Sequence, residues 1–261
     1  MDLRQLNRRA WDRQVEIGNP WTVPVAPEVI AAARTGRWQI RLTPTKPVPA
    51  GWLGDVRGKR VLCLASGGGQ QGPVLAAAGA TVTVFDNSPR QLEQDRRVAQ
   101  RDGLAMETVE GTMVDLSAFA DDSYDLIVNP VSTIFIDDVR TVWKECARVL
   151  RPGGSMLVGV VNPVVYCFDL KLMDTTGQLE MRHKLPYSDS NTLTAEEIED
   201  WQQKGLPLEF SHTLEALVGG QLDAGLVITG LYEDHDQPQP GEVLNGYFEK
   251  YIALRSLKMT R

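Results

Sequence analysis

The sequence predicts a doubly wound α/β fold, in which a mostly parallel sheet carries helices on both faces. Three observations support this prediction. Between residues 60 and 163, short apolar runs alternate with segments of helical pattern. The runs are nearly continuously apolar, which is typical of strands buried on both faces of a parallel sheet. The first run leads directly into Gly67, Gly69 and Gly72, which have the spacing G-x-G-x-x-G of a ligand-binding turn.

Composition excludes several classes of protein. The chain has 261 residues and a net charge of −7, so it lacks the basic character of a nucleic-acid-binding protein. No apolar run approaches the roughly 20 residues that span a bilayer, and the polar segment 1–14 does not look like a signal peptide. Cys63, Cys146 and Cys167 are too far apart for a metal site. We therefore expect a cytoplasmic protein with reduced thiols, no metal, and no nucleic-acid or membrane partner.

Residues 1–54 are predicted to form an N-terminal helical lid and a linker. The pattern of 2–16 predicts a helix with apolar residues on one side, and 26–36 reads as a second helix that ends at Gly36. The segment 41–55 is rich in proline and glycine, so we expect a linker or lid there.

The alternating region supplies the core elements of a domain that we place at 55–261. The helix at 88–103 has Ser88 as its predicted N-cap and Pro89 in its first turn. The other elements follow in chain order: strand 60–65, helix 72–80, strands 81–86, 106–111 and 124–130, helix 138–150, and strand 155–163.

Residues 162–210 interrupt this alternation. We expect a strand at 178–185 and a polar helix at 194–205 within them. This insertion is predicted to form a cap over the carboxyl edge of the sheet, where ligands bind in open α/β folds. After it the pattern predicts a helix at 211–225 and two strands, 226–234 and 245–258.

The glycine turn alone does not identify its ligand. Glycines allow close approach of a ligand to the backbone, and the following helix offers free N–H groups. Asp86 ends the next strand and is placed to accept the hydroxyls of a ribose. These features suit NAD or another nucleoside equally well.

Three longer segments narrow the choice. They are "VLCLASGGG" at 61–69, "VTVFDNSPRQLEQDR" at 82–96, and "DDSYDLIV" followed by "CARVLRPGG" between 121 and 154. Together they resemble the class I S-adenosylmethionine-dependent methyltransferases, in the small-molecule, methyltransferase-11-like branch. The resemblance covers about residues 55–165. It implies a Rossmann-like sheet of seven strands with an antiparallel last strand, and transfer of a methyl group from S-adenosyl-L-methionine.

The resemblance also implies a set of cofactor-binding residues. They are Ala65, Ser66, Gly67, Gly69, Gln70, Asp86, Asn87, Thr112, Met113 and Asn129. Three positions depart from the family pattern. Cys63 replaces the strand acid that helps hold the amino group of the cofactor, and Ala65 replaces the first glycine of the turn. Thr112 replaces the acid that often meets the adenine amino group, a contact left to Asp115 or to the backbone of 113–114. Gln70 is either a cofactor contact or simply the opening of the helix.

The segment after the fourth strand is where acceptor and methyl donor are expected to meet. Its "NPVS" lacks the second proline and the aromatic residue of the amine-gripping N-P-P-[YF] motif. The "NRRAWD" stretch at 7–12 is similar to the opening of methyltransferases whose first helix closes over the cofactor. We therefore expect a small-molecule acceptor in a pocket that includes Trp11, Val131, Ser132, Asn162 and Tyr166.

Three side chains are weak candidates for a general base that removes a proton from the acceptor: His183, His212 and Tyr187. Each is better explained as a packing or surface residue. Three other functions stay open: an NAD-dependent oxidoreductase, a non-catalytic S-adenosylmethionine-binding protein, and a nucleic-acid methyltransferase. The sequence predicts neither the identity of the acceptor nor the oligomeric state.

Overall fold

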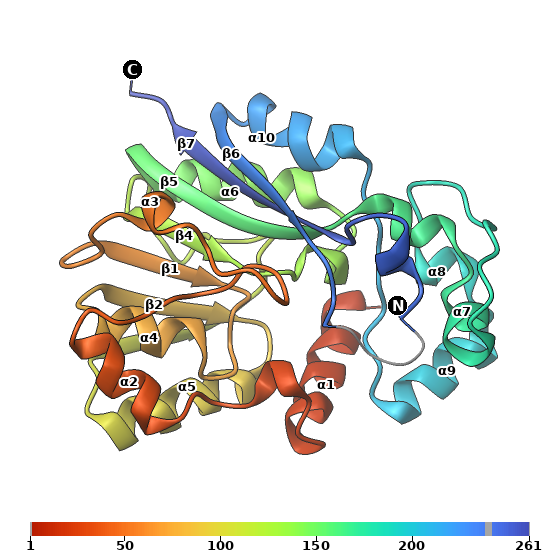
Figure 1. Ribbon diagram of the computed structural model, residues 1–261, viewed down its shortest axis with the longest axis horizontal. Coiled ribbons are helices and arrows are strands. Elements are labelled where there is room, and N and C mark those ends of the chain that lie inside the picture. The colour runs from red at the N-terminus through yellow and green to blue at the C-terminus, as the bar shows by residue number, and fades with distance from the viewer. Residues whose placement is uncertain (1, 238–241, 261) are drawn as a thin grey trace.

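The computed structural model describes residues 2–237 and 242–260, and in this part of the chain seven strands form one sheet (Figure 1). The strand order is β3-β2-β1-β4-β5-β7-β6. The first five strands are parallel, whereas β7 runs antiparallel to both β5 and β6. The predicted fold class is therefore confirmed. The strands are β1 Arg60–Leu64, β2 Thr81–Asp86, β3 Met106–Glu110, β4 Tyr124–Asn129, β5 Leu150–Val161, β6 Leu226–Asp234 and β7 Tyr251–Lys258.

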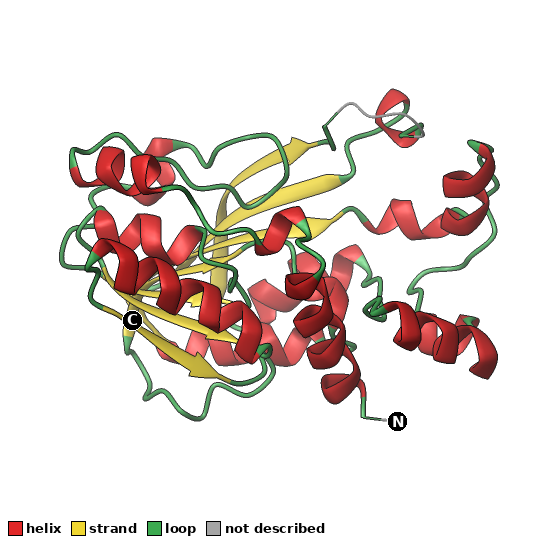
Figure 2. Cartoon of the chain, turned by 90° about the horizontal axis from the view of Figure 1, so that it is seen from below, coloured by secondary structure: helices red, strands yellow, loops and turns green. Residues whose placement is uncertain are grey.

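Helices cover both faces of the sheet (Figures 1 and 2). One face carries α2 (Pro27–Arg34), α4 (Gln71–Ala77) and α5 (Pro89–Asp102), and the other carries α6 (Val139–Val149) and α10 (Gly220–Asp223). Because side chains alternate along a strand, β1 sends Val61 and Cys63 into the first layer and Leu62 and Leu64 into the second. A π-helical turn, Glu215–Gly219, precedes α10.

Local signals explain where α5 begins and ends. The Oγ of Ser88 accepts a hydrogen bond from the N–H of Gln91 at 3.1 Å, and Pro89 occupies the first turn. Gly103 follows with a φ of 60°, the left-handed conformation that commonly ends a helix. The predicted N-cap is therefore confirmed, and it fixes the position of α5 beside the end of β2.

The N-terminal region contains α1 (Leu3–Glu16), a 3₁₀ turn at Pro20–Thr22, α2, and the short α3 (Ala50–Leu53). The segment 41–55, expected to be a linker or lid, instead contributes Leu42, Val48 and Leu53 to the hydrophobic core. A Cβ on Gly159 of β5 would lie only 2.2 Å from the carbonyl oxygen of Leu42. This segment is therefore packed closely against the sheet.

The insertion at 162–210 lies beyond the carboxyl ends of the strands, beside α1 (Figure 1). The strand expected at 178–185 is wrong, because the only pairing there among the described residues is an isolated bridge between Phe168 and Met181. Backbone hydrogen bonds join this run to Cys167 and Asp169, and within the described part of the chain no strand continues the pairing beyond them. The helices of the insertion are a 3₁₀ turn at Pro163–Cys167, α7 Leu170–Thr176, α8 Asp189–Thr192 and α9 Ala195–Lys204. A last 3₁₀ turn, Leu244–Gly246, precedes β7.

Candidate active site

A cavity of about 530 Å³ lies at the carboxyl edge of the sheet, and we call it the edge cavity. Its volume is within the ~300–1,000 Å³ that is common for small-molecule sites. Its walls come from the glycine loop (65–70), the end of β2, the loops after β3 and β4, α1, and the segment 41–44. Most of the predicted site residues line it: Trp11, Ala65, Ser66, Gly67, Gln70, Asp86, Asn87, Thr112, Met113, Val131 and Ser132.

Two buried carboxylates hold the backbone of the glycine loop. The N–H of Gly67 donates to Oδ2 of Asp86 at 2.9 Å, and the N–H of Gly68 donates to Oδ2 of Asp95 at 3.0 Å. A pyrophosphate-binding turn needs its N–H groups free to point at the anion. Here these groups are already bonded, and the ionised carboxylate of Asp86 beside them disfavours an anionic ligand by Coulomb repulsion.

Asp86 joins three parts of the site. Its Oδ1 accepts from the N–H of Ser88 at 2.9 Å while its Oδ2 holds Gly67. Burial raises the pKa of Asp86 to about 6. The backbone N–H groups of Ser88, Gly67 and Asn87 oppose this rise, and the negative charge of Asp12 adds to it. Each carboxylate oxygen has two lone pairs, so Asp86 can accept further hydrogen bonds from a ligand in the cavity.

Asp95 packs against the glycine loop, close enough to Cys63 for its charge to act on that thiol. Its side chain is fully buried, and its Oδ1 has no hydrogen-bond partner among the described residues. Burial raises the pKa of Asp95 well above the usual range, although backbone N–H groups of Gly69 and Gly68 lower it in part. The same acid raises the pKa of Cys63, after the larger effect of burial.

The loop after β3 forms the wall next to Asp86. The N–H of Gly111 donates to the carbonyl of Asp86 at 3.0 Å, and residues 112–114 then line the cavity. A Cβ on Gly111 would lie 2.1 Å from Cζ of Phe85. Glycine is therefore required for this loop to cross so close to the end of β2.

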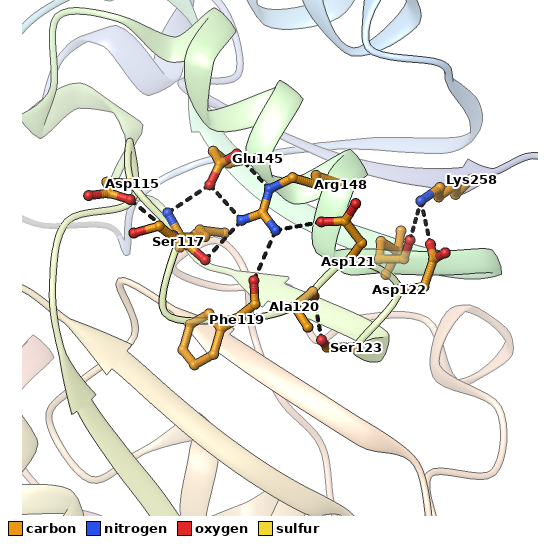
Figure 3. Close-up of polar contacts among 12 residues, drawn as sticks. Asp115, Ser117, Phe119, Ala120, Asp121, Asp122, Ser123, Glu145, Arg148 and Lys258 are labelled. Carbon is orange, nitrogen blue, oxygen red and sulfur yellow. Dashed lines mark hydrogen bonds and ion pairs between the residues drawn. The ribbon is translucent and has the colours of Figure 1, made fainter.

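Arg148, within the predicted family motif, fastens the continuation of this loop (Figure 3). Its guanidinium donates to the carbonyls of Leu116 and Phe119 and to the carboxylates of Asp121 and Glu145, all at 2.8–2.9 Å. The hydrogen bond from Arg148 is the main reason that the pKa of Glu145 lies below its usual value. The motif thus stabilises a wall of the site from α6, without contacting the cavity.

Helix α1 covers the cavity and is attached to both sides of it. Asn7 donates to the carbonyls of Phe135 (2.9 Å) and Leu208 (3.0 Å), and its Oδ1 accepts from the N–H of Leu208 at 2.8 Å. Trp11 packs edge-on against Phe135, with ring centroids 5.1 Å apart. Asn87 is also engaged, since it donates to the carbonyl of Arg4 at 3.0 Å.

Four predicted site residues lie outside the lining of the cavity. Gly69 has a φ of 73° and turns the glycine loop against α5. Asn129 is fully buried and donates to the carbonyl of Leu64 and to Ser132, both at 2.8 Å. Asn162 caps the following 3₁₀ turn. Tyr166 is buried behind the wall, where its hydroxyl donates to Oε2 of Glu209 at 2.6 Å.

The three candidate bases also lie elsewhere. His212 donates from Nε2 to the carbonyl of Thr133 at 2.9 Å in the tautomer that this contact requires, and burial lowers its pKa. It lines a second hollow of about 490 Å³ together with Tyr187. His183 packs edge-on against Tyr187, with ring centroids 4.9 Å apart. The structure brings none of them to the edge cavity.

Several lining residues had no role in the sequence prediction: Asn7, Arg41, Thr43, Gln91, Phe135, Glu209 and Tyr251. The sequence contains a pattern that could have indicated a site role for only two of them, Gln91 and Glu209. Gln91 precedes Asp95 by four positions on α5, so both face the glycine loop from one side of that helix. Glu209 is an isolated acid between Leu208 and Phe210.

In residues 2–237 and 242–260, no group of three or more potential ligands is arranged to hold a metal ion. None of the helices described there combines the length and the apolar character that crossing a membrane would require.

Comparison with known proteins adds independent information. A family model described as a methyltransferase domain matches residues 62–158. An uncharacterized methyltransferase of Bacillus subtilis, YbaJ, is 51% identical over 253 residues, which is 97% of each chain. A ubiquinone biosynthesis O-methyltransferase of Actinobacillus pleuropneumoniae is 26% identical over 148 residues, 55% of this chain and 63% of the relative.

The fold is also found among solved structures. An S-adenosylmethionine-dependent methyltransferase from Mesorhizobium loti superposes with a TM-score of 0.62 at 17% sequence identity. The match covers 79% of this chain and 94% of that protein. At this identity the similarity concerns the fold.

Proposed function

Because the chain belongs to the class I S-adenosylmethionine-dependent methyltransferases, we propose that its edge cavity holds the methyl donor beside a small-molecule acceptor. S-adenosyl-L-methionine supplies a methyl group that its sulfonium already activates, so no covalent intermediate on the protein is needed. The contribution of the protein is to bind, align and enclose the two reactants.

The pair of carboxylates under the glycine loop is the observation that carries this proposal. Gly67 and Gly68 direct their N–H groups to Asp86 and Asp95 rather than to a ligand. This arrangement suits a ligand with positive charge near the loop and opposes a pyrophosphate. It therefore favours the methyl donor over NAD, the alternative that the glycine spacing had left open.

The residues of the cavity fit the parts of this cofactor. Asp86 would accept the hydroxyls of the ribose, residues 112–114 and Asn87 would flank the adenine, and the backbone of 65–67 would lie along the methionine chain. The Oγ of Ser66 is buried without a hydrogen-bond partner among the described residues and would bond to the methionine group. Arg41 also lines the cavity and would meet the carboxylate of the methionine group.

We infer that Asp95 compensates for the acid that is absent at position 63, where this chain has Cys63. The family acid at this strand position is missing, and Asp95 of α5 supplies a carboxylate to the same loop from an adjacent position. Asp95 is a positioning residue in this proposal, because it touches the loop and not the cavity.

The enclosure of the cavity favours a small acceptor. Helix α1 would serve as the lid, and the insertion at about 162–210 would serve as the cap of a domain that begins near residue 55. The acidic composition also disfavours RNA and DNA as substrates. The free cysteines fit a reducing compartment, so we propose a cytoplasmic location.

Calorimetric titration with S-adenosylhomocysteine, with NAD⁺ in parallel, tests the cofactor assignment. We expect micromolar binding of S-adenosylhomocysteine alone and a loss of that binding in Asp86→Ala. Asp200→Asn, on the exposed face of α9, is the matched control and should bind normally. Binding of NAD⁺ alone would overturn the proposal.

A further inference from the structure

Glu209 lines the part of the edge cavity that lies far from Asp86. The lining also includes Val131, which follows β4, Val161, which ends β5, and Tyr251, which begins β7 and whose pKa is raised in part by the charge of Glu209. Asp86 ends β2, and the order β2-β1-β4-β5-β7 places these residues two to four strand spacings away. At ~4.8 Å per spacing this is roughly 10–19 Å. We call the region around Glu209 the acceptor end.

The main chain holds Glu209 firmly in this wall. The N–H of Glu209 donates to Oδ2 of Asp189 at 2.6 Å, and the N–H of Leu208 donates to Asn7 at 2.8 Å. On the other side, the N–H of Phe210 donates to the carbonyl of Ile134 at 2.7 Å. The segment 208–210, at the end of the insertion, is thus hydrogen-bonded to α1, to Asp189 of α8 and to the loop after β4.

The carboxyl group of Glu209 is also oriented. Tyr166 donates to Oε2 at 2.6 Å from behind the wall, whereas Oε1 makes no hydrogen bond to the described residues. One oxygen is therefore fixed by the protein and the other is free for a ligand. This is the arrangement expected of a positioned base.

The surroundings of Glu209 favour a proton on its carboxyl group near neutral pH. Burial raises the pKa of Glu209 to about 7; the Tyr166 hydrogen bond and Lys250 oppose this rise, and the carboxylates of Asp189 and Asp174 add to it. Tyr251 and Tyr187 are also close enough for the charge of Glu209 to contribute to their raised pKa values. A general base is most effective when its pKa is close to the working pH.

The remaining lining of the acceptor end is largely apolar and aromatic. Its members include Trp11, Val131, Ile134, Phe135 and Val161. Such walls bind the apolar body of a small molecule, and a single polar group among them determines which end group is accepted.

We propose that Glu209 removes the proton from the acceptor, and that the acceptor is a mainly apolar molecule carrying a hydroxyl or an amine. This inference rests on the proposed methyl transfer. A lone pair of the acceptor oxygen or nitrogen forms the bond to the methyl carbon, and the carbon–sulfur bond breaks with its electron pair left on sulfur. The acceptor's proton passes to Oε1 of Glu209 and then to solvent. Once Glu209 is ionised to act as a base, its charge disfavours an acceptor with a carboxylate or phosphate at this end.

Three probes on a similar scaffold test the acceptor class: 4-ethylphenol, 2-phenylethylamine and 3-phenylpropanoate. Binding is measured by titrating each probe into protein saturated with S-adenosylhomocysteine. In a separate assay with S-adenosylmethionine, methylation of each probe is followed by the formation of S-adenosylhomocysteine. At pH 8, where Glu209 is mostly ionised, we expect the phenol or the amine to bind at least about tenfold more tightly than the carboxylate, because only the carboxylate meets a like charge. Which of the two is methylated distinguishes an oxygen from a nitrogen acceptor.

Glu209→Gln tests the base. It should lower turnover by about 100-fold or more and leave the affinity for S-adenosylhomocysteine unchanged. Glu199→Gln, exposed on α9, is the matched control. A second readout is ¹³C NMR of labelled glutamate carboxyls. One signal should titrate near pH 7, disappear in Glu209→Gln, and shift to higher pKa in Tyr166→Phe.

The outcomes separate the two proposals. If wild-type protein fails to bind S-adenosylhomocysteine, the methyl transfer itself is wrong. If the wild-type protein binds the cofactor product but prefers 3-phenylpropanoate or binds none of the probes, the role of Glu209 is wrong. Normal turnover by the Glu209→Gln variant would show the same.

Discussion

Oδ2 of Asp86 accepts a hydrogen bond from the N–H of Gly67 across 2.9 Å, and this contact joins the end of β2 to the turn after β1. Because the other carboxylate oxygen holds Ser88 at the start of α5, one side chain positions two walls of the cavity. The proposed ribose contact is thus made by a residue that the fold itself keeps in place.

The first prediction concerns the pH dependence of cofactor binding. The pKa of Asp86 is raised from 3.8 to about 6 in the folded chain, so its contribution to the free energy of unfolding falls as the pH rises from about 4 to about 6 and is constant at higher pH. A ribose needs the ionised acceptor. The affinity for S-adenosylhomocysteine should therefore fall below pH 6, by up to about tenfold per pH unit.

Calorimetry between pH 5 and pH 8 measures this dependence. Asp12 and Asp95 also face Asp86, so the assignment needs Asp86→Asn, which should bind more weakly and lose the dependence. An unchanged affinity from pH 7 to pH 5 in the wild-type protein would contradict the proposed contact.

The second prediction concerns Asp95 and Cys63. Asp95→Leu removes the carboxylate that shares the N–H of Gly68 with the carbonyl of Gln91 and should cost about 1 kcal/mol of unfolding free energy, the typical net value of one hydrogen bond. It should also weaken S-adenosylhomocysteine binding, because the glycine loop loses its support. Asp95→Asn keeps an acceptor oxygen and removes a buried charge, so its affinity should stay near that of the wild-type protein.

Adding Cys63→Asp to Asp95→Leu returns a carboxylate to the strand position that the family uses. Calorimetry should then show recovered affinity, which a merely structural role for Asp95 would not give. Wild-type binding by Asp95→Leu alone would show that the loop needs no acid.

These residues illustrate what could be predicted from the sequence. The strand–turn–helix around Gly67, the end of β2 at Asp86 and the cap at Ser88 depend on neighbours close in the chain, so local pattern is sufficient. The motif around Arg148 was recognised in the same way, although its role in fastening the loop after β3 appeared only in the structure.

The acceptor end was missed for a physical reason. Glu209, Tyr251 and Asn7 come from segments far apart in sequence, and they meet only through the tertiary contacts of α1 and the insertion. Histidine chemistry favoured His183 and His212 as bases, but burial and packing direct their rings elsewhere. The proline-rich segment at 41–55 was misjudged because its apolar residues lack any regular period.

The third prediction concerns Ala65, whose φ of 44° lies in the left-handed region. This conformation costs a residue with a Cβ ~1–2 kcal/mol. Ala65→Gly should therefore raise the unfolding free energy by roughly 0.5–1 kcal/mol, after the larger unfolded-state entropy of glycine is subtracted. Urea unfolding measures the change. Ala99→Gly, within α5, should have the opposite sign, and equal losses in both variants would refute the argument.

The fourth prediction concerns Arg148. Lysine has three donors on one atom and cannot reach the two carbonyls and two carboxylates that the guanidinium joins. Arg148→Lys should lower the unfolding free energy by ~1–3 kcal/mol and speed hydrogen exchange in residues 112–120. Arg97→Lys, on the exposed face of α5, should change neither quantity. Normal exchange in this loop would show that Arg148 does not organise it.

The last prediction tests α1 as a lid. Asn7 is buried and makes three hydrogen bonds to the main chain of Phe135 and Leu208, on the far wall of the cavity. Asn7→Leu keeps the size of the side chain but leaves those groups unpaired, at a cost of ~1–3 kcal/mol each while α1 stays docked. Undocking of α1 returns the groups to water, so the variant should populate an open form in which residues 3–16 exchange hydrogen faster.

An open lid has a kinetic consequence that a local packing defect lacks. Dissociation of S-adenosylhomocysteine, followed by stopped-flow displacement, should become about tenfold faster or more, because the ligand can leave whenever α1 is undocked. Gln5→Leu makes a similar amide-to-leucine change on the exposed side of the same helix and should leave both measurements unchanged. Faster exchange in α1 with an unaltered dissociation rate would mean that the ligand leaves by another route, and that α1 supports the acceptor end without closing over the cofactor.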